Sequence, residues 1–202
     1  MSKEALIITE KIKEPVRYNT HTLFNHISRY SIAIDRLNIN KNDNVLDSSC
    51  ASGYGTYCLS KVAYFTIGVD INKDYLKEAE SCFEGEHIDF CTYKELKENM
   101  IGSFTKIVCI ETFEHIEKEK QPEFIKMLLN ELANGGDMFL TTPLNNDCPS
   151  EYNKFHLNEP SLNTLYKMLK DKFQSITFET SQFLNSFDKI QEYCYCICRN
   201  KI

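Results

Sequence analysis

The sequence predicts an α/β fold in which a doubly wound, mostly parallel sheet carries helices on both faces. Short apolar and β-branched runs alternate with helix-like stretches through the middle of the chain, which is the pattern of βαβ units. Two more strand-like runs close the chain, and the last strand is expected to run antiparallel. Together these runs predict seven strands.

Each expected strand is a run of five to seven residues rich in apolar and β-branched side chains. The final run contains Cys194, Cys196 and Cys198, whose strict alternation favours one face of a strand over a metal-binding turn. The seven runs are 44–48, 65–71, 87–92, 106–110, 137–142, 175–179 and 193–199.

Helix-like stretches lie between most of these strands. The segment "QPEFIKMLLNELANGG" has Pro122 near its start, apolar residues at helical spacing, and two glycines as a stop signal. An amphipathic stretch precedes the first strand, and another helix precedes the last two. The expected helices are 20–37, 54–62, 73–83, 121–133 and 161–172.

The length of 202 residues predicts a single domain. Within residues 1–202 we expect an N-terminal helical lid at 1–40 and a ligand-binding core at 41–145. Residues 146–202 are expected to supply an acceptor-side segment and the closing strands. No repeat, low-complexity segment or long linker divides the chain.

Composition narrows the class of partner. The net charge of −6 argues against a duplex nucleic-acid partner, which requires a surplus of Lys and Arg. The first twelve residues show no signal-peptide pattern, and no apolar run of about 18 residues predicts a membrane span. Nine scattered cysteines without a C-x-x-C pair fit reduced thiols, so a cytoplasmic location is expected.

The stretch "NVLDSSCASGYGTYCLS" is an apolar strand that leads into small residues and then a helix. In a doubly wound sheet, ligands bind beyond the carboxyl ends of the strands, and small residues let them approach the backbone. The next strand ends at Asp70, 23 positions after Asp47. An acid at that place is positioned to accept hydrogen bonds from the two ribose hydroxyls of a nucleoside.

These motifs resemble the class I S-adenosylmethionine-dependent methyltransferases. "VLDSSCASG" is similar to their first motif, V-L-D-x-G-C-G-x-G, with Ser49 and Ala51 in place of two glycines and Gly53 retained. "GVDIN" and "FTKIVCIETFEHI…LLNELANGGDMFLTTP" are similar to later motifs, so the resemblance covers about 40–145. It implies a Rossmann-like seven-stranded fold and S-adenosyl-L-methionine as cofactor.

The resemblance also implies roles for individual residues. Asp47 would orient the turn near the methionine amino group, Asp70 would hold the ribose, and Ile71 would pack on the adenine. Thr92 or Tyr93 would meet the adenine amine. The implied cofactor residues are Asp47, Ser49, Ala51, Gly53, Asp70, Ile71, Thr92 and Glu111.

The replacements of two glycines in the first motif affect the backbone of the turn. Ser49 and Ala51 fit a close ligand if neither position requires a positive φ angle. A positive φ at either position would store strain of about 1–3 kcal/mol.

A second constellation lies in "IETFEHIEKEK". If the chain turns helical from Thr112, then Glu111, Glu114 and His115 lie on one side of one turn. With His156 from "NKFHLNEP" these residues form a candidate divalent-cation site, with Mg²⁺ as the expected ion.

The second constellation is similar to the Glu-x-x-Glu-His motif of small-RNA 3′-end 2′-O-methyltransferases and to a Glu-His pair of ubiquinone-biosynthesis O-methyltransferases. The whole chain resembles bacterial sugar and small-molecule methyltransferases more closely. They share an H-x-x-R-Y helix (His26, Arg29, Tyr30) and an F-H-x-x-E segment.

Three interpretations of His115 stay open: a metal ligand, a metal-free catalytic or substrate-orienting residue, or no chemical role. His115 and Glu114 are the candidate catalytic residues. The expected function is methyl transfer to an oxygen or nitrogen of a small molecule, such as a sugar or nucleotide-sugar. The alternatives are a metal-dependent RNA 3′-end methyltransferase and a non-catalytic methyltransferase-like binding protein. The acceptor and the oligomeric state do not follow from the sequence.

Overall fold

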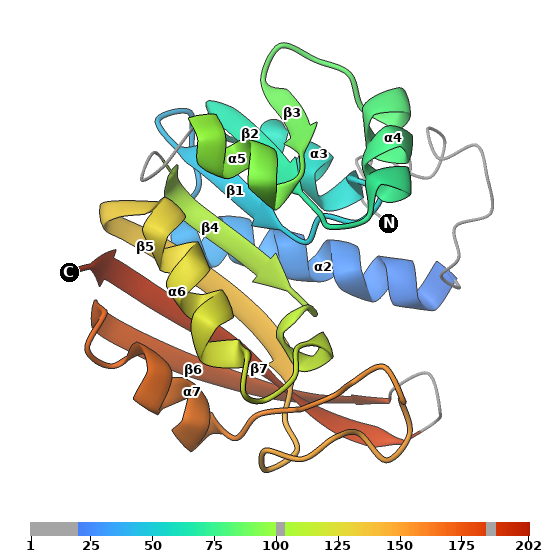
Figure 1. Cartoon of the computed structure of the whole chain (residues 1–202), viewed down its shortest axis with the longest axis vertical. Coiled ribbons are helices and arrows are strands. Elements are labelled where there is room, and N and C mark those ends of the chain that lie inside the picture. The colour runs from blue at the N-terminus through green and yellow to red at the C-terminus, as the bar shows by residue number, and fades with distance from the viewer. Residues whose placement is uncertain (1–19, 100–103, 185–188) are drawn as a thin grey trace. The chain divides into compact units, whose positions relative to one another are not determined.

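The computed structural model describes residues 20–99, 104–184 and 189–202 (Figure 1). In this part of the chain, no helix is both long and apolar enough to cross a membrane. The chain forms two compact units, 1–100 and 101–202, each with its own set of paired strands.

In the first unit, residues 20–99 form three parallel strands in the order β3-β2-β1. They are β1 (Asn44–Ser48), β2 (Phe65–Val69) and β3 (Ile88–Cys91). Asp47 of β1 stands opposite Gly68 of β2, so the two strands end side by side. Parallel pairing brings the carboxyl ends of all three strands to one edge, where the predicted cofactor residues follow them.

The described residues of this unit form the helices α2 (Thr20–Leu37), α3 (Tyr54–Ser60), α4 (Lys73–Cys82) and α5 (Tyr93–Asn99). The side chain of Asn72 caps α4 by accepting a hydrogen bond from the backbone N–H of Asp74 at 3.0 Å. The α2 helix packs closely on α3, because a Cβ on Gly55 would lie only 1.9 Å from the ring of Tyr30.

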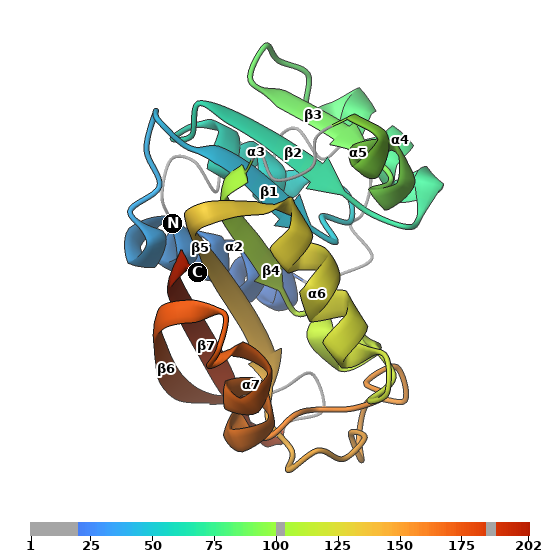
Figure 2. The ribbon, with the colours of Figure 1, turned by 60° about the vertical axis from the view of Figure 1, so that its left-hand side comes forward.

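The second unit contains four strands in the order β4-β5-β7-β6. Strands β4 (Phe104–Ile110) and β5 (Leu132–Pro143) are parallel, whereas β7 (Ile190–Lys201) runs antiparallel to both β5 and β6 (Phe173–Leu184). The short 3₁₀ helix η1 (Phe113–His115) follows β4. Helices α6 (Gln121–Glu131) and α7 (Leu162–Leu169) lie on one face of this sheet (Figure 2).

The prediction of seven strands, with an antiparallel last strand, is confirmed within the described residues. The expected helix at 20–37 has the predicted bounds, and the other four expected helices are present but end one to three residues earlier. The α5 helix was not predicted, whereas the helical turn considered from Thr112 is present as the short 3₁₀ helix η1. The division into a lid, a core and an acceptor-side segment stays a prediction.

Candidate functional site

The turn between β1 and α3 takes a left-handed backbone at three positions. The φ angles are 63° at Ser49, 47° at Ala51 and 82° at Gly53. The first two residues therefore adopt the conformation that favours glycine, and each is expected to store about 1–2 kcal/mol of strain. The turn keeps the shape of a glycine-rich loop although two glycines are replaced.

Gly53 is required by packing as well as by its φ angle. A Cβ there would lie 2.6 Å from the Cβ of Ala79 in α4 and 2.8 Å from the ring of Phe90 in β3. Any larger residue would push these neighbouring elements away from the turn.

Asp47 lies under this turn and is fully buried. Its carboxylate accepts hydrogen bonds from the Thr56 hydroxyl at 2.6 Å and the Tyr30 hydroxyl at 3.1 Å. Burial raises the pKa of Asp47 to about 7, although both hydrogen bonds oppose this shift. These contacts tie Asp47 to α2 and α3, which fits the predicted role in orienting the turn.

Asp70 connects the turn to the end of β2. Its carboxylate accepts a hydrogen bond from the backbone N–H of Ala51 at 2.9 Å and from that of Asn72 at 2.8 Å. Each carboxylate oxygen has a further lone pair that a ribose hydroxyl can use. The next residue, Ile71, is 85% exposed, an unusual exposure for an isoleucine that suits the predicted packing against an adenine.

Thr92 and Tyr93 take different positions after β3. The backbone N–H and the hydroxyl of Thr92 both donate to Glu95, at 2.8 and 2.7 Å, so Thr92 caps α5. The Tyr93 hydroxyl instead reaches the β1 end of the turn, 2.6 Å from the Ser48 hydroxyl and 3.3 Å from that of Ser49. Both residues stay candidates for the adenine amine, but each already has a local hydrogen-bond partner.

In the second unit, Glu111 follows β4 with a φ angle of 50°. Its carboxylate accepts a hydrogen bond from the Thr141 hydroxyl of β5 at 2.9 Å, which holds the side chain at the strand end. The predicted roles of Glu111 in cofactor and metal binding stay predictions.

Three of the four predicted metal ligands come together in this unit. One ligand atom each from Glu114, His115 and His156 lies within 4.8 Å of the other two, and Glu111 is outside this group. The rings of His115 and His156 meet edge to face with centroids 4.9 Å apart. Glu114 is fully buried, and its carboxylate accepts a hydrogen bond from the Thr142 hydroxyl at 3.2 Å.

The hydrogen bonds of the two histidines leave the same ring atom available on each. Nδ1 of His115 lies 2.9 Å from the Phe155 carbonyl, and Nδ1 of His156 lies 2.6 Å from the Glu159 carboxylate. Both acceptors place the proton on Nδ1, so Nε2 is the atom that can bind a metal or a proton. Burial of the ring lowers the pKa of His115 although the hydrogen bond to the Phe155 carbonyl opposes this shift, and a lowered pKa favours the neutral imidazole at pH 7.

Two supporting groups of this cluster were not predicted from the sequence. Glu159 is 1% exposed and orients His156. The sequence feature that could have predicted this role is the position of Glu159 three residues after the histidine. Gln121 and Asn158 form a buried pair: Nδ2 of Asn158 donates to Oε1 of Gln121 at 3.0 Å, and Nε2 of Gln121 donates to the backbone carbonyl of Asn158 at 3.0 Å. Gln121 also donates to the Phe113 carbonyl at 3.0 Å, so it ties η1 to the His156 segment.

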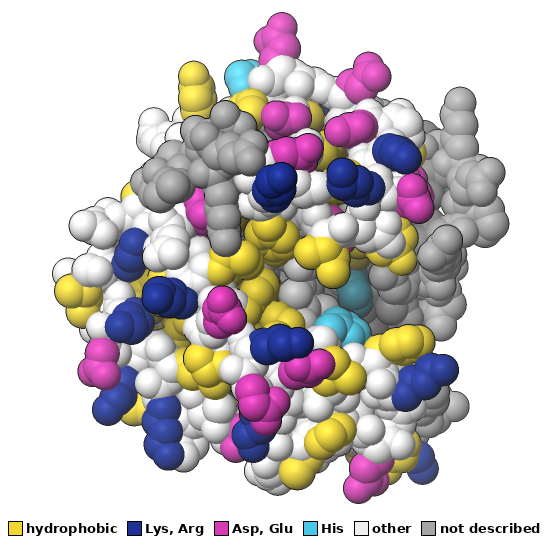
Figure 3. Space-filling model, in the orientation of Figure 1, with side chains coloured by type: hydrophobic (Ala, Val, Ile, Leu, Met, Phe, Trp, Pro, Cys, Tyr) yellow, Lys and Arg dark blue, Asp and Glu magenta, His cyan; other side chains and the backbone are white. Residues whose placement is uncertain are grey.

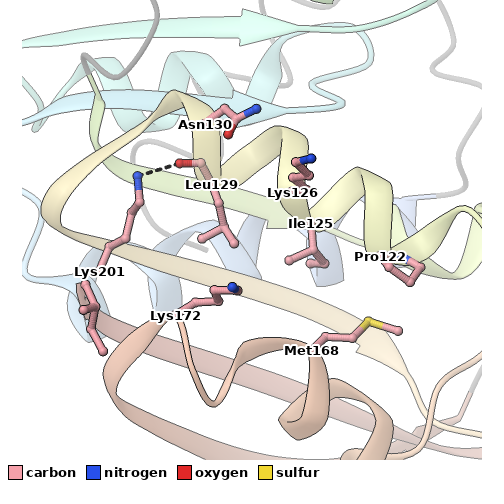
Figure 4. Close-up of a pocket in the computed structure, with 9 residues that line it drawn as sticks. Pro122, Ile125, Lys126, Leu129, Asn130, Met168, Lys172 and Lys201 are labelled. Atoms are coloured by element: carbon pink, nitrogen blue, oxygen red, sulfur yellow. Dashed lines mark hydrogen bonds between the residues drawn. The ribbon is translucent and has the colours of Figure 1, made fainter.

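A separate pocket of about 460 Å³ lies between α6, α7 and the end of β7 (Figure 4). Its apolar lining includes Ile125, Leu129 and Met168, and Lys126 and Lys172 also line it. None of its lining residues is a predicted site residue. On the face shown in Figure 3, Lys and Arg side chains are interspersed with Asp and Glu side chains.

The sequence profile of the mycolic acid cyclopropane synthetase family matches residues 22–159, which is more than half of the chain. The chain belongs to this family. It is therefore a class I S-adenosylmethionine-dependent methyltransferase, as the motif resemblance predicted. A search of curated proteins found no match for the methyltransferase.

Solved structures share the fold of this methyltransferase. N-methyltransferase NodS from Bradyrhizobium japonicum WM9, in complex with S-adenosyl-L-homocysteine, has a TM-score of 0.68 and 16% identity over 98% of this chain and 99% of its own. YcgJ from Bacillus subtilis has a TM-score of 0.61 and 15% identity, and the match covers 86% of this chain and 96% of YcgJ. The [4+2]-cyclase SpnF has a TM-score of 0.68 and 11% identity, and the match covers 87% of this chain and 82% of SpnF. These likenesses confirm the Rossmann-like fold and leave the acceptor open.

Proposed function

We propose that this methyltransferase transfers a methyl group from S-adenosyl-L-methionine to a hydroxyl oxygen of a small, sugar-like acceptor. One observation carries the proposal: Nδ1 of His115 is hydrogen-bonded to a backbone carbonyl oxygen, and the lowered pKa of the ring favours its neutral form at pH 7. Such an imidazole has Nε2 ready to accept a proton at pH 7.

In the first unit, Asp70 would hold the ribose hydroxyls, Ile71 would pack on the adenine, and the Ser49–Gly53 turn would approach the methionine part. This arrangement is supported by the acceptor capacity of Asp70 and by the exposure of Ile71. The role of these residues is positioning, because a methyl group held in line with its acceptor reacts far faster than one that diffuses.

In the second unit, Nε2 of His115 would take the proton of the acceptor hydroxyl. When bound, S-adenosyl-L-methionine would supply the electrophilic methyl group to the hydroxyl oxygen and would leave as S-adenosylhomocysteine, with the electron pair of the broken carbon–sulfur bond on sulfur. Glu114 and His156 would orient the acceptor or His115, which their place in the same cluster supports.

The same cluster supports a second candidate, a bound divalent cation. A carboxylate and two imidazoles with orienting partners on Nδ1 form a donor set that fits a metal. With Glu111 outside the group, two nitrogens and one carboxylate suit a transition metal such as Zn²⁺ or Fe²⁺ better than Mg²⁺. A bound cation would lower the pKa of a coordinated hydroxyl.

The test begins with a screen of hydroxylated sugars and nucleotide-sugars, with formation of S-adenosylhomocysteine as the readout. With an acceptor found, His115→Ala should lower kcat at least about 100-fold, while His87→Ala, an exposed control, should not. For a metal-free base, a chelator should have no effect, and the rate should fall only below pH 6.5 because the pKa of His115 is lowered.

The metal candidate predicts different results in the same assay. A chelator should abolish turnover, a transition metal should restore it, and His156→Ala should be as severe as His115→Ala. Full activity of His115→Ala without chelator sensitivity would overturn both roles of the cluster. The RNA-end alternative is disfavoured by the net charge of −6.

A further inference from the structure

The strained turn of the first unit needs contacts that hold it. Ser49 and Ala51 occupy left-handed φ angles without being glycine. An isolated serine or alanine would relax out of that region, since the conformation costs about 1–2 kcal/mol per residue. The surrounding structure must therefore fix both residues.

Ala51 is held through its backbone. Its N–H donates to the Asp70 carboxylate at 2.9 Å, and the N–H of the preceding Cys50 donates to the Val69 carbonyl at 2.9 Å. Both bonds attach the middle of the turn to the end of β2. Neither of them reaches Ser49.

Ser49 is held by a different element, through Tyr93, the first residue of α5. The Tyr93 hydroxyl lies 2.6 Å from the Ser48 hydroxyl and 3.3 Å from the Ser49 hydroxyl. A phenol can donate to one hydroxyl and accept from the other at the same time. Ser48 is 1% exposed, so its hydroxyl would lose a hydrogen-bond partner in a buried position if the Tyr93 hydroxyl were removed.

We propose that Tyr93 is a positioning residue for the cofactor, whose hydroxyl holds Ser48 and Ser49 and so keeps the glycine-poor turn in its binding shape. The proposal rests on the proposed binding of S-adenosyl-L-methionine at this turn. Tyr93 thus supplies a side-chain restraint where a glycine would take the same backbone conformation without help.

The proposal makes the effect of Tyr93 depend on the residue at position 49. Tyr93→Phe keeps the ring and removes the hydroxyl, so it should weaken binding of S-adenosylhomocysteine about five- to twentyfold. In a Ser49→Gly background the same change should cost threefold or less, because glycine holds a positive φ unaided. Tyr64→Phe, at a residue 59% exposed in the same unit, is the control and should bind as the wild type does.

Calorimetric titration of the wild type, both single variants and the double variant measures this coupling as a double-mutant cycle. Equal effects of Tyr93→Phe in the two backgrounds, or no effect in either, would overturn the proposal. A merely structural tyrosine would lower the melting temperature in both backgrounds and leave the two Kd ratios equal.

Two further results separate this proposal from the function on which it rests. If Tyr93→Phe does not fold, Ser48→Ala removes the shorter bond and should weaken binding in the same direction. Normal binding by folded Ser48→Ala would then overturn the proposal. Failure of the wild type to bind S-adenosylhomocysteine would overturn the proposed cofactor site itself, whereas normal wild-type binding without coupling overturns only the role of Tyr93.

Discussion

At the scale of single residues, Asp47 is a buried carboxyl group that the fold keeps protonated over an unusual range. Its pKa is raised from 3.8 to about 7 by burial, with the hydroxyls of Thr56 and Tyr30 as partners. Between these two pH values the folded protein binds a proton that the unfolded chain releases. The contribution of Asp47 to the free energy of unfolding therefore falls as the pH rises from 4 to 7.

Asp47→Asn should remove this dependence, because an amide of the same shape does not ionise. The difference in free energy of unfolding, variant minus wild type, should increase steadily from pH 4 to pH 7 and should stay constant above pH 8. Urea unfolding at several pH values measures the difference, with exposed Asp171→Asn as the control. A constant difference across this range would show that Asp47 is ionised in the folded protein.

Ala51 tests the strain in the turn more directly than Ser49, since it has no side-chain hydrogen bond to lose. Ala51→Gly should raise the free energy of unfolding by about 0.5–1 kcal/mol, the strain released at φ 47° less the added entropy of the unfolded chain. Ser81→Gly, in the helical backbone of α4, should lower it by about the same amount. A loss of stability in Ala51→Gly would mean that the left-handed conformation carries no strain.

At the scale of elements, a buried amide pair joins the start of α6 to the segment that carries His156. Gln121 and Asn158 are 0% and 2% exposed, and their amides bond to each other and to nearby carbonyls. The backbone carbonyl of Glu114 also accepts a hydrogen bond from the Leu157 N–H at 2.8 Å. These bonds keep His115 of η1 and His156 in one cluster.

Gln121→Ala should lower the free energy of unfolding by about 2–4 kcal/mol. The buried carbonyls that accept from Gln121 lose their donor, and the Asn158 amide loses its acceptor. Asn158→Ala should cost about 1–3 kcal/mol, and the double variant should cost less than the sum of the two. Asn130→Ala, an exposed change on the same helix, should stay within about 0.5 kcal/mol. Additive losses in urea unfolding would show that the two amides act separately.

The elements with clear hydrophobic periodicity were predictable from the sequence, and the short polar ones were not. All seven strands and five of the six described α-helices were expected, although β5 and β6 run to twelve residues each and extend well beyond their expected ranges. The α5 helix was missed because "YKELKEN" has a single apolar side chain between its ends, although the Thr92–Glu95 capping box was a usable signal. The η1 turn is too short to show a period.

The candidate site was predictable as a set of residues but not as a geometry. Motif resemblance identified Asp70 and the turn, while the positive φ angles of Ser49 and Ala51 depend on contacts from β2 and α5. The cluster of Glu114, His115 and His156 followed from residue type and spacing. The separation of Glu111 from that cluster did not, because it depends on a hydrogen bond from Thr141 of β5.

At the scale of the whole molecule, binding of the cofactor product is linked to the stability of the fold. A ligand that binds only the folded protein adds about 2.7 kcal/mol at a concentration 100 times its Kd. For a chain of 202 residues, each kcal/mol added to the free energy of unfolding raises the melting temperature by about 2–4 °C, so we expect a rise of about 5–10 °C. The same measurement reports on the Asp70 carboxylate, which is proposed to hold the ribose.

We expect S-adenosylhomocysteine to raise the melting temperature of the wild type by this amount, and Asp70→Ala to lose most of the rise. Loss of a charged, buried acceptor should weaken binding by about 1.5–3 kcal/mol, which leaves a stabilisation of about 0.3–1.3 kcal/mol at the same ligand concentration. Asp74→Ala, with a side chain 90% exposed in the first turn of α4, is the matched control and should keep the full shift. An equal shift in Asp70→Ala would place the ribose elsewhere. A wild type that shows no shift would favour the non-catalytic alternative, in which the strained turn has lost its ligand.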